Sequence, residues 1–234
     1  EELQRIIAGR DKLYSVIAHD LRSPMGSIKM VLNMLMLNLP VEKIGGEMYE
    51  LLTMANRTTE DVFSLLDNLL KWTKSQIGNL NVVYQDVDAV EVVDSVIDVF
   101  NMVAGLKKIT IREEKPEKLP VCTDIDMLKT IIRNLLSNAI KFSNENSEVL
   151  VKMEEQGDTV VVSVKDSGCG IDEGQQKLLH TDTHFSTFGT NNEEGSGLGL
   201  LLCQDFAVKI GGKLWFTSKE GEGSTFYFSI PLKK

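Results

Sequence analysis

The sequence predicts an α+β protein of two domains, a helical hairpin followed by an α/β domain. The chain has 234 residues, which suits one large or two modest domains, each able to bury a core. Apolar residues recur every three or four positions up to about residue 72, as in helices. Beyond residue 80, short runs that alternate apolar and polar residues appear between helical ones. This change of period places a domain boundary near residues 78–82.

Residues 1–77 are predicted to form two long antiparallel helices. From Leu3 to Leu39 a heptad frame that starts at Ile7 places mostly apolar residues on one seam, and a second seam runs from Met48 to Trp72. Between them, Asn38–Gly46 contains the proline and paired glycines of a turn. Two helices cannot enclose their own apolar stripes, so we expect two hairpins to pair into a four-helix bundle and the protein to be a homodimer.

Residues 83–234 are predicted to form the α+β domain, after a linker at 78–82. Alternating runs predict strands, and helical spacing predicts three helices. The predicted strands are 108–112, 149–153, 160–164, 213–217 and 225–230, and the predicted helices are 87–103, 124–142 and 197–210. Gly157 and Asp158 lie between two alternating runs and predict a hairpin turn.

Composition and charge exclude several classes of protein. Hydrophobic residues make up 42% and charged residues 25%, as in ordinary soluble domains. The net charge of -9 argues against a nucleic-acid-binding surface, and no apolar run approaches the roughly 20 residues of a membrane span. The chain opens EELQRIIAGR, without a signal peptide, as expected of a piece of a longer protein. Its three scattered cysteines predict reduced thiols in a cytosolic setting.

The stretch SVIAHDLRSP, Ser15 to Pro24, places a histidine beside an aspartate on the first predicted helix. His19 occupies heptad position f, opposite the seam, so its ring should face solvent. Asp20 can orient the ring and leave its other nitrogen nucleophilic. Pro24 cannot donate a hydrogen bond to the Asp20 carbonyl, which predicts a bend just beyond His19. Alternatively, His19 is an ordinary surface histidine, and Pro24 marks the end of one helix and the start of another.

Glycine-rich segments of the second domain suggest a nucleotide site. They are Asp166–Gly170 (DSGCG) after a strand-like run, Gly195–Gly199 (GSGLG) at the start of a helix, and Gly221–Thr225 (GEGST) before the last strand. Glycines at a helix start let backbone amides approach phosphate. Asp166 could accept a hydrogen bond from an exocyclic amine such as that of adenine.

Two amides and an ammonium are predicted to converge on one helix face. Asn134, Asn138 and Lys141 are four and three residues apart. An asparagine carbonyl suits Mg²⁺, and a lysine can neutralise phosphate. A merely polar surface stripe is the alternative, although the apolar face of this helix is already occupied by Leu135, Leu136 and Ala139.

Taken together, these segments resemble sensor histidine kinases of two-component signalling. SVIAHDLRSP resembles the phosphoacceptor H box, IIRNLLSNAIKFS the N box, DSGCGI and GSGLGL the G1 and G2 boxes, and GEGSTF the last glycine box. The matches cover nearly the whole chain in the expected order. The resemblance implies a dimerisation and histidine-phosphotransfer hairpin, followed by a catalytic ATP-binding domain of the Bergerat type, an α/β sandwich.

The resemblance also implies a role for each site residue. His19 matches the phosphoacceptor and Asp20 its acidic neighbour, while Asn138 matches the Mg²⁺-binding asparagine, with Asn134 and Lys141 on the phosphate side. Asp166 matches the aspartate that reads adenine. The remaining predicted ATP-binding residues are Gly168 and Gly170 at the start of a lid over about 167–194, Gly195, Gly197, Leu198 and Gly199 beside the phosphates, and Thr225 near the adenine pocket. Phe185 and Phe188 resemble the F box of that lid.

Three features depart from the family pattern. Thr190 lies where many relatives carry a basic residue, so we expect phosphate contacts from backbone amides and Lys141 instead. Ser23 stands four residues after His19, where relatives with phosphatase activity often have Thr or Asn. His180 and His184 are spaced as metal ligands on a helix would be, but with no third ligand in view we favour a solvated lid surface.

The predicted activity is autophosphorylation. His19 attacks the γ-phosphate of ATP with Mg²⁺ held at Asn138, and the phosphoryl group passes to an aspartate of a response-regulator receiver domain. Two alternatives stay open: a helical scaffold whose ATP domain binds nucleotide without transferring phosphate, and an ATP-gated dimerising machine like the chaperone and mismatch-repair relatives of this nucleotide fold. Members of the family can be anchored upstream in a membrane, so we expect this chain to be a cytoplasmic portion of a larger sensor.

Overall fold

The computed structural model describes residues 2–38, 45–76, 81–179, 189–190 and 198–232. Within the helices a few residues, including 2–16, 18 and 19, are described by their backbone alone. The chain divides into two compact units, residues 1–80 and 81–234.

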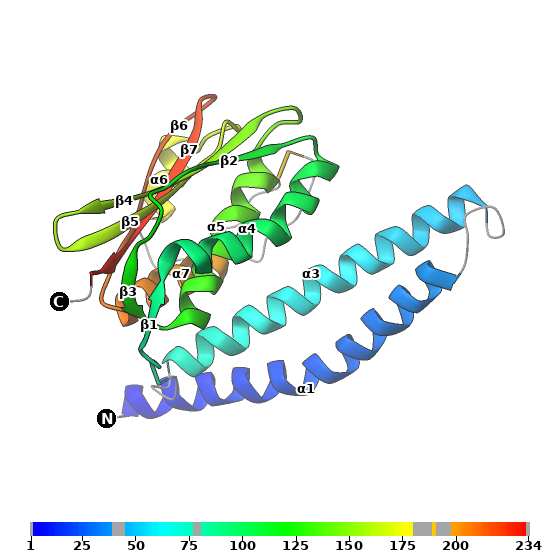
Figure 1. Cartoon of the computed structure of the whole chain (residues 1–234). Helices are drawn as coiled ribbons and strands as arrows, with labels where there is room; N and C mark the ends of the chain where they lie inside the picture. The colour runs from blue at the N-terminus through cyan, green and yellow to red at the C-terminus, as the bar shows by residue number, and fades with distance from the viewer. Residues whose placement is uncertain (1, 39–44, 77–80, 180–188, 191–197, 233–234) are drawn as a thin grey trace. The chain divides into compact units, whose positions relative to one another are not determined.

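The first unit is a hairpin of two long helices, α1 (Glu2–Asn38) and α3 (Gly46–Gln76), packed side by side (Figure 1). Helix α1 is continuous through Pro24, so the alternative in which Pro24 separates two helices is wrong. Figure 1 shows that α1 changes direction partway along its length. Most of the predicted turn between the helices, residues 39–44, lies outside the described residues.

Salt bridges and a small apolar cluster join the two helices. Asp67 pairs with Arg22 across the hairpin and with Lys71 at 3.0 Å along α3. Leu66 and Leu70 are buried, with Met25 and Leu69 packed against them. Many large apolar side chains nevertheless stay exposed on the hairpin. They include Leu21, Ile28, Val31, Leu35, Leu51, Met54, Val62 and Leu65. A single hairpin therefore leaves much of its apolar surface uncovered, as the sequence predicted.

The second unit is a two-layer α/β sandwich. Its main sheet has the strand order β2 (Thr110–Glu114), β4 (Glu148–Gln156), β5 (Thr159–Lys165), β7 (Gly223–Pro231) and β6 (Leu214–Lys219). Strands β2 and β4 are parallel, and the other neighbours are antiparallel. A second small sheet pairs β1 (Gln85–Asp88) with β3 (Pro120–Thr123).

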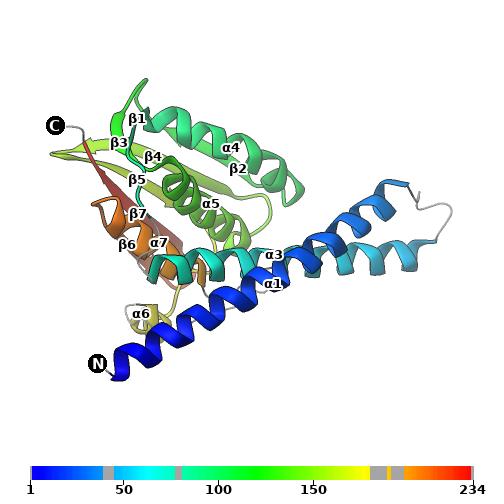
Figure 2. The same ribbon diagram turned by 90° about the horizontal axis from the view of Figure 1, so that it is seen from below.

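Helices cover one face of the main sheet. They are α4 (Ala89–Leu106), α5 (Ile125–Phe142) and α7 (Leu198–Lys209), while the short α6 (Glu173–Leu179) follows β5 (Figures 1 and 2). The core between the sheet and the helices contains Val162 and Val164 of β5, Phe228 of β7, and Leu128 and Ile131 of α5, all of which are buried. Because alternate strand residues point to opposite faces, the apolar alternation seen in the sequence supplies this core.

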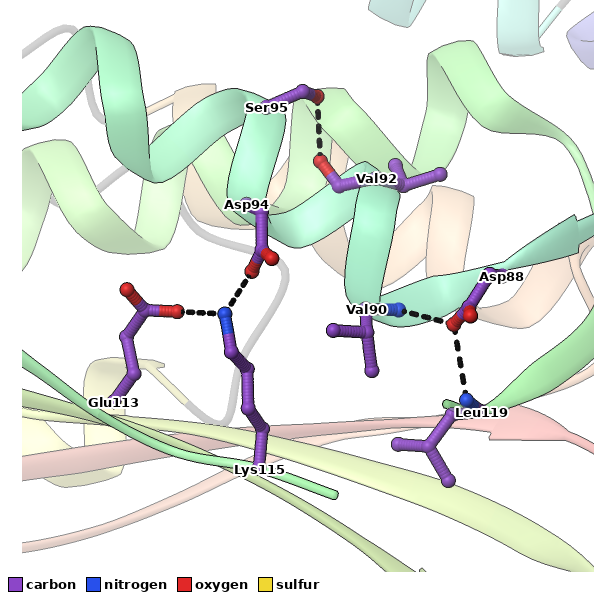
Figure 3. A network of polar contacts seen from close by, with 8 residues as sticks. All are labelled: Asp88, Val90, Val92, Asp94, Ser95, Glu113, Lys115 and Leu119. Carbon is purple, nitrogen blue, oxygen red and sulfur yellow. Dashed lines mark hydrogen bonds and ion pairs between the residues drawn. The ribbon is translucent and has the colours of Figure 1, made fainter. Parts of the chain in front are cut away.

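Two aspartates fix the starts of the helices. Asp88 caps α4, and its Oδ1 accepts hydrogen bonds from the amides of Val90 and Leu119, at 3.0 and 2.9 Å (Figure 3). Asp124 caps α5 in the same manner, and its Oδ2 also accepts the Val83 amide at 2.8 Å. Each carboxylate satisfies free amides of the first helical turn and joins the helix to another segment.

A lysine joins α4 to the strand layer. Figure 3 shows Lys115, which follows β2, between Asp94 of α4 and Glu113 of β2. Burial lowers the pKa of Lys115, but its two carboxylate partners outweigh this and raise the pKa overall. The pair of carboxylates thus helps to hold α4 over one edge of the sheet.

The α+β fold and the helical hairpin are confirmed. Each predicted strand overlaps an observed strand of the main sheet, and each predicted helix overlaps an observed helix. Strands β1 and β3 and helix α6 were not predicted. Most of the predicted linker lies outside the described residues. None of the described helices has a stretch long and apolar enough to cross a membrane.

Candidate active site

Asp166 lies directly after β5 and is buried, with 4% of its surface exposed. Its Oδ1 accepts hydrogen bonds from the amides of Gly168 at 2.9 Å and Ser224 at 3.2 Å. The Asp166 amide donates in turn to the Ser224 carbonyl at 2.9 Å. Among the described residues, no donor contacts Oδ2. One carboxylate oxygen is therefore fixed by the protein, and the other is left for a ligand with a donor group.

The electrostatics of Asp166 reflect this burial. Burial raises the pKa of the carboxyl above its usual value, and the amides of Gly168 and Ser224 lower it only partly. The ionised form is therefore less favourable here than in water. A carboxyl with a perturbed pKa is a common feature of functional sites.

Gly168 and Gly170 shape the loop after Asp166. A Cβ atom on Gly168 would lie 2.0 Å from the Phe142 carbonyl at the end of α5, and one on Gly170 would lie 2.0 Å from the Lys219 carbonyl. Gly170 also has φ of +67°, a conformation that favours glycine. No side chain fits at either position, so the glycines let the loop pass between α5 and the β6–β7 turn.

The structure places Ser224, and not Thr225, beside Asp166. Thr225 is opposite Lys165 in the β5–β7 ladder, and Lys165 is exposed on the far side of the sheet from the helices. Because residues opposite each other in a ladder share a face, Thr225 points away from Asp166. The buried Ser224 contacts Asp166 through its main chain, and its hydroxyl lies 2.9 Å from that of Ser218. Ser224 therefore contacts Asp166, and a role for Thr225 in ATP binding stays a prediction.

Asn134 brings the middle of α5 to the start of α7. Its Nδ2 donates to the Thr130 carbonyl at 2.9 Å, and a Cβ atom on Gly199 would lie 2.7 Å from its Oδ1. Gly199 is thus required for this close approach. Leu198, the first residue of α7, is buried. The structure therefore brings together two segments that are about 60 residues apart in the sequence.

Asn138 and Lys141 continue the same face of α5. Both side chains are half-buried. Asn138 makes no side-chain hydrogen bond with the described residues, so its amide is available to a ligand. The Lys141 ammonium lies 4.8 Å from the centre of the Phe142 ring. A hard oxygen ligand and a cation therefore lie one turn apart at the end of α5.

Part of the predicted lid is described. Residues 173–179 form α6, and the Gln176 amide donates to the carbonyls of Ile171 and Ser218, at 2.7 and 3.2 Å. The Thr190 amide donates to the Lys141 carbonyl at 3.2 Å. The other predicted lid features lie outside the described residues. They are His180, His184, Phe185 and Phe188. The predicted phosphate-binding glycines Gly195 and Gly197 also lie outside the described residues.

Lys107 is a buried residue that the sequence analysis did not single out. Its ammonium donates to the carbonyls of Ile140 and Lys141, at 3.1 and 2.8 Å, and to the Thr190 hydroxyl at 2.6 Å. Nothing in the sequence separates this lysine from the exposed Lys108 beside it. Its role becomes visible only when the ends of α4 and α5 are seen to meet.

His19 and Asp20 lie in α1, on the same helix as Ser23 and Pro24. Asp20 and Ser23 are exposed, while the side chain of His19 lies outside the described residues. The predicted exposure of the His19 ring therefore stays a prediction. Elsewhere in the described part of the chain, no cluster of three or more His, Cys, Asp or Glu residues could hold a metal ion.

Comparisons with known proteins agree with this fold. The profile of the histidine kinase-, DNA gyrase B-, and HSP90-like ATPase family matches residues 123–234. The adaptive-response sensory kinase SasA of Crocosphaera subtropica is 29% identical over 237 residues, covering 99% of this chain and 62% of the relative. The sensor protein KdpD of Clostridium acetobutylicum is 34% identical over 228 residues, covering 95% of this chain and 25% of the relative. The chain thus spans less than two thirds of either relative.

Solved structures show the same fold. Full-length ShkA in complex with AMPPNP superposes with a TM-score of 0.71 at 21% identity, over 94% of this chain and 45% of that one. The nucleotide-free catalytic domain of the histidine kinase ThkA gives a TM-score of 0.56 at 29% identity, over 64% of this chain and 95% of that domain. The order of the motifs, the fold of both units and these relatives agree. Residues 123–234 carry the histidine kinase-, DNA gyrase B-, and HSP90-like ATPase domain, and the chain as a whole is similar to sensor histidine kinases.

Proposed function

We propose that this chain is an ATP-dependent protein histidine kinase that phosphorylates its own His19 and passes the phosphoryl group to an aspartate of a response-regulator receiver domain. The observation that carries the proposal is the state of Asp166. Its Oδ1 is fixed by two backbone amides, and its Oδ2 has no donor among the described residues. An adenine amino group supplies the missing donor.

The phosphates are proposed to bind between α5 and the start of α7. Gly199 allows α7 to begin against Asn134, and free amides at a helix start favour an anion. Asn138 and Lys141 extend from the same face of α5. Gly195 and Gly197 precede α7 in the sequence and are proposed to contribute further amides. Asn138 is proposed to hold Mg²⁺, which would offset the phosphate charge when bound.

The chemical step is a transfer of the γ-phosphoryl group. A neutral ring nitrogen of His19 attacks the γ-phosphorus, a nitrogen–phosphorus bond forms, and the bond from that phosphorus to the bridging oxygen breaks to release ADP. Asp20 orients the ring and accepts the proton from its other nitrogen. In the second step, a receiver aspartate attacks the same phosphorus and releases His19.

The proposed assembly follows the hairpin. A homodimer would cover the apolar side chains that α1 and α3 leave exposed. The relatives are larger sensor kinases, and we propose that this chain is likewise the cytoplasmic portion of a larger sensor. Residues 167–194 are proposed to be a lid over the nucleotide.

Calorimetry of ATP binding to the whole chain, with Mg²⁺ and with EDTA, tests the nucleotide site. We expect Mg²⁺ to strengthen ATP binding in the parent, and Asn138→Ala to remove most of that gain. Ser137→Ala, an exposed neighbour on α5, is the matched control. An equal effect of Mg²⁺ on the parent and on Asn138→Ala would contradict the metal assignment. ATP binding without any phosphorylation would favour the scaffold, and phosphate release that survives His19→Ala would favour the ATP-gated machine.

A further inference from the structure

The end of α4 places a lysine where α5 ends. Helix α4 closes with the amide of Lys108 bound to the Gly105 carbonyl at 3.0 Å and that of Ile109 bound to the Ala104 carbonyl at 2.9 Å. Lys108 has φ of +56°. This pattern is a Schellman motif, which ends the helix and reverses the chain. It fixes the main chain on either side of Lys107 and turns the Lys107 side chain into the domain, where only 7% of the residue is exposed.

The buried ammonium of Lys107 meets the exposed carbonyls of a helix end. The last four carbonyls of a helix lack partners within it, and a cation there is stabilised by the helix dipole. The Lys107 ammonium contacts the carbonyls of Ile140 and Lys141. The α5 C-terminal cap, Ser143, covers the Ala139 carbonyl with its amide at 3.0 Å. Burying a charge is costly without such partners, so the carbonyls at the end of α5 are what allow the Lys107 ammonium to be buried here.

The same ammonium also holds Thr190. The Thr190 hydroxyl accepts from the Lys107 ammonium at 2.6 Å, which leaves its own hydrogen for the Ser143 carbonyl at 2.8 Å. The Thr190 amide donates to the Lys141 carbonyl. Three segments far apart in the sequence, at residues 107, 140–143 and 190, are therefore joined by one cation and one hydroxyl.

We propose that Lys107 is a positioning residue of this kinase, which holds Thr190 against the last turn of α5 and so fixes the main chain that carries Lys141. The link to catalysis rests on the proposed function, since Lys141 is proposed to face the phosphates. The tether itself does not depend on nucleotide. Thr190 then has a defined role at the position where many members of the family carry a basic residue.

Two variants remove one side of the tether each. Lys107→Met keeps the length of the side chain and removes its charge and donors, and Thr190→Val keeps the shape and removes the hydroxyl. Thr190→Ser keeps the hydroxyl and should behave like the parent. Lys108→Met removes the same charge from the neighbouring exposed lysine and is the matched control.

Hydrogen exchange of the nucleotide-free chain, measured on peptides that contain Thr190, is the first readout. A hydrogen bond to a charged group contributes about 1.5–3 kcal/mol, so we expect exchange in these peptides to quicken at least about tenfold in Lys107→Met and Thr190→Val. Exchange as slow as in the parent in both variants would overturn the proposal, and so would an equal effect of Lys108→Met. If Lys107→Met does not fold, Thr190→Val at its exposed position decides the result.

The kinetics of autophosphorylation are the second readout. Misplacing a group that binds phosphate in both the ground state and the transition state raises KM for ATP more than it lowers kcat. We expect a rise in KM of about tenfold in both variants, recovered in Thr190→Ser. Unchanged KM with faster exchange would restrict Lys107 to a structural role and overturn the positioning claim. A parent without autophosphorylation would instead refute the proposed function, and the exchange result would still decide whether the tether exists.

Discussion

The carboxyl of Asp166 is in a state that lowers the stability of the fold and suits its proposed role in binding adenine. It is buried, its Oδ1 is bound by two amides, and burial still raises the pKa of the carboxyl above its ordinary value. A raised pKa means that the ionised carboxylate is less favourable in the folded protein than in the unfolded chain. At neutral pH the charged Asp166 therefore makes the fold less stable than an uncharged side chain of the same shape would. Such a cost is typical of a residue retained for its ligand.

Asp166→Asn should separate these two effects. An asparagine oxygen can still accept from Gly168 and Ser224, but its amide presents a donor to the donor of adenine. We expect ATP binding to weaken about 10- to 100-fold, the loss of one charge-assisted hydrogen bond, without a loss of stability at pH 7. Calorimetry and denaturation by urea measure the two quantities.

The pH dependence of this variant has a definite sign. The raised pKa means that the folded parent binds a proton more readily than the unfolded chain, so lowering the pH from 7 towards the ordinary aspartate range stabilises the parent relative to Asp166→Asn. As the pH is lowered, the free energy of unfolding of the parent should therefore rise relative to that of Asp166→Asn. A shift in the opposite direction, or unchanged ATP affinity, would contradict the role given to Asp166.

The residue types of the site could be predicted from the sequence, but not all of its geometry. The glycines stand out because the close approach of two segments restricts the residue type, as it does at Gly168 and Gly199. The asparagines stand out as oxygen ligands that would suit the proposed metal ion. The contact of Ser224 with Asp166 could not be predicted, because the face that a strand residue occupies depends on the exact register, and a shift of one residue reverses it. Lys107 was missed because a buried lysine has no local signal. Its partners come from α5 and from Thr190.

Among the elements, α1 combines the proposed phosphoacceptor, His19, with a proline inside a continuous helix. Proline removes one backbone hydrogen bond and clashes with the preceding turn, at a cost of about 3 kcal/mol or more. The hydroxyl of Ser27 donates to the Ser23 carbonyl at 3.2 Å, within the same stretch. The helix is thus weakened just beyond His19, where a bend would alter how His19 is presented.

Pro24→Ala tests whether this weakness matters. We expect the hairpin to gain stability, by up to about 3 kcal/mol, and autophosphorylation to slow because α1 bends less easily. Thermal unfolding and the initial rate of labelling give the two numbers. Ser27→Ala is a control for a small change in the same stretch. An unchanged rate together with an unchanged bend would remove Pro24 from the mechanism.

Elements with a long repeat were predictable, and short ones were not. Helices α4 and α5 and strands β4 and β5 carry several periods of their apolar pattern. Strands β1 and β3 have four residues each, too few to establish alternation, and they form only by pairing with one another. Helix α6 has no buried residue, so no apolar face marks it in the sequence.

For the molecule as a whole, the exposed apolar side chains of the hairpin predict a homodimer. Leu51 of α3 is 59% exposed, and burying one leucine contributes about 1.5–3 kcal/mol. Leu51→Lys changes both copies in a dimer, so we expect the dissociation constant to rise at least about 100-fold. Sedimentation equilibrium over a range of concentrations measures this shift.

A leucine on the other unit provides the comparison. Leu106 at the end of α4 is 86% exposed, and Leu106→Lys introduces the same charge. It should leave the dimer unchanged. If both variants dissociate to the same extent, or neither does, the hairpin is not the dimerisation element.

Labelling with γ-labelled ATP and Mg²⁺ tests the central claim most directly. The parent and His19→Gln are each incubated with the label in separate reactions. The labelled protein is then treated with acid and with alkali. Phosphohistidine predicts a label that is lost in acid, survives alkali and is absent from His19→Gln. Equal labelling of His19→Gln, or no label on a parent that binds ATP, would contradict the account.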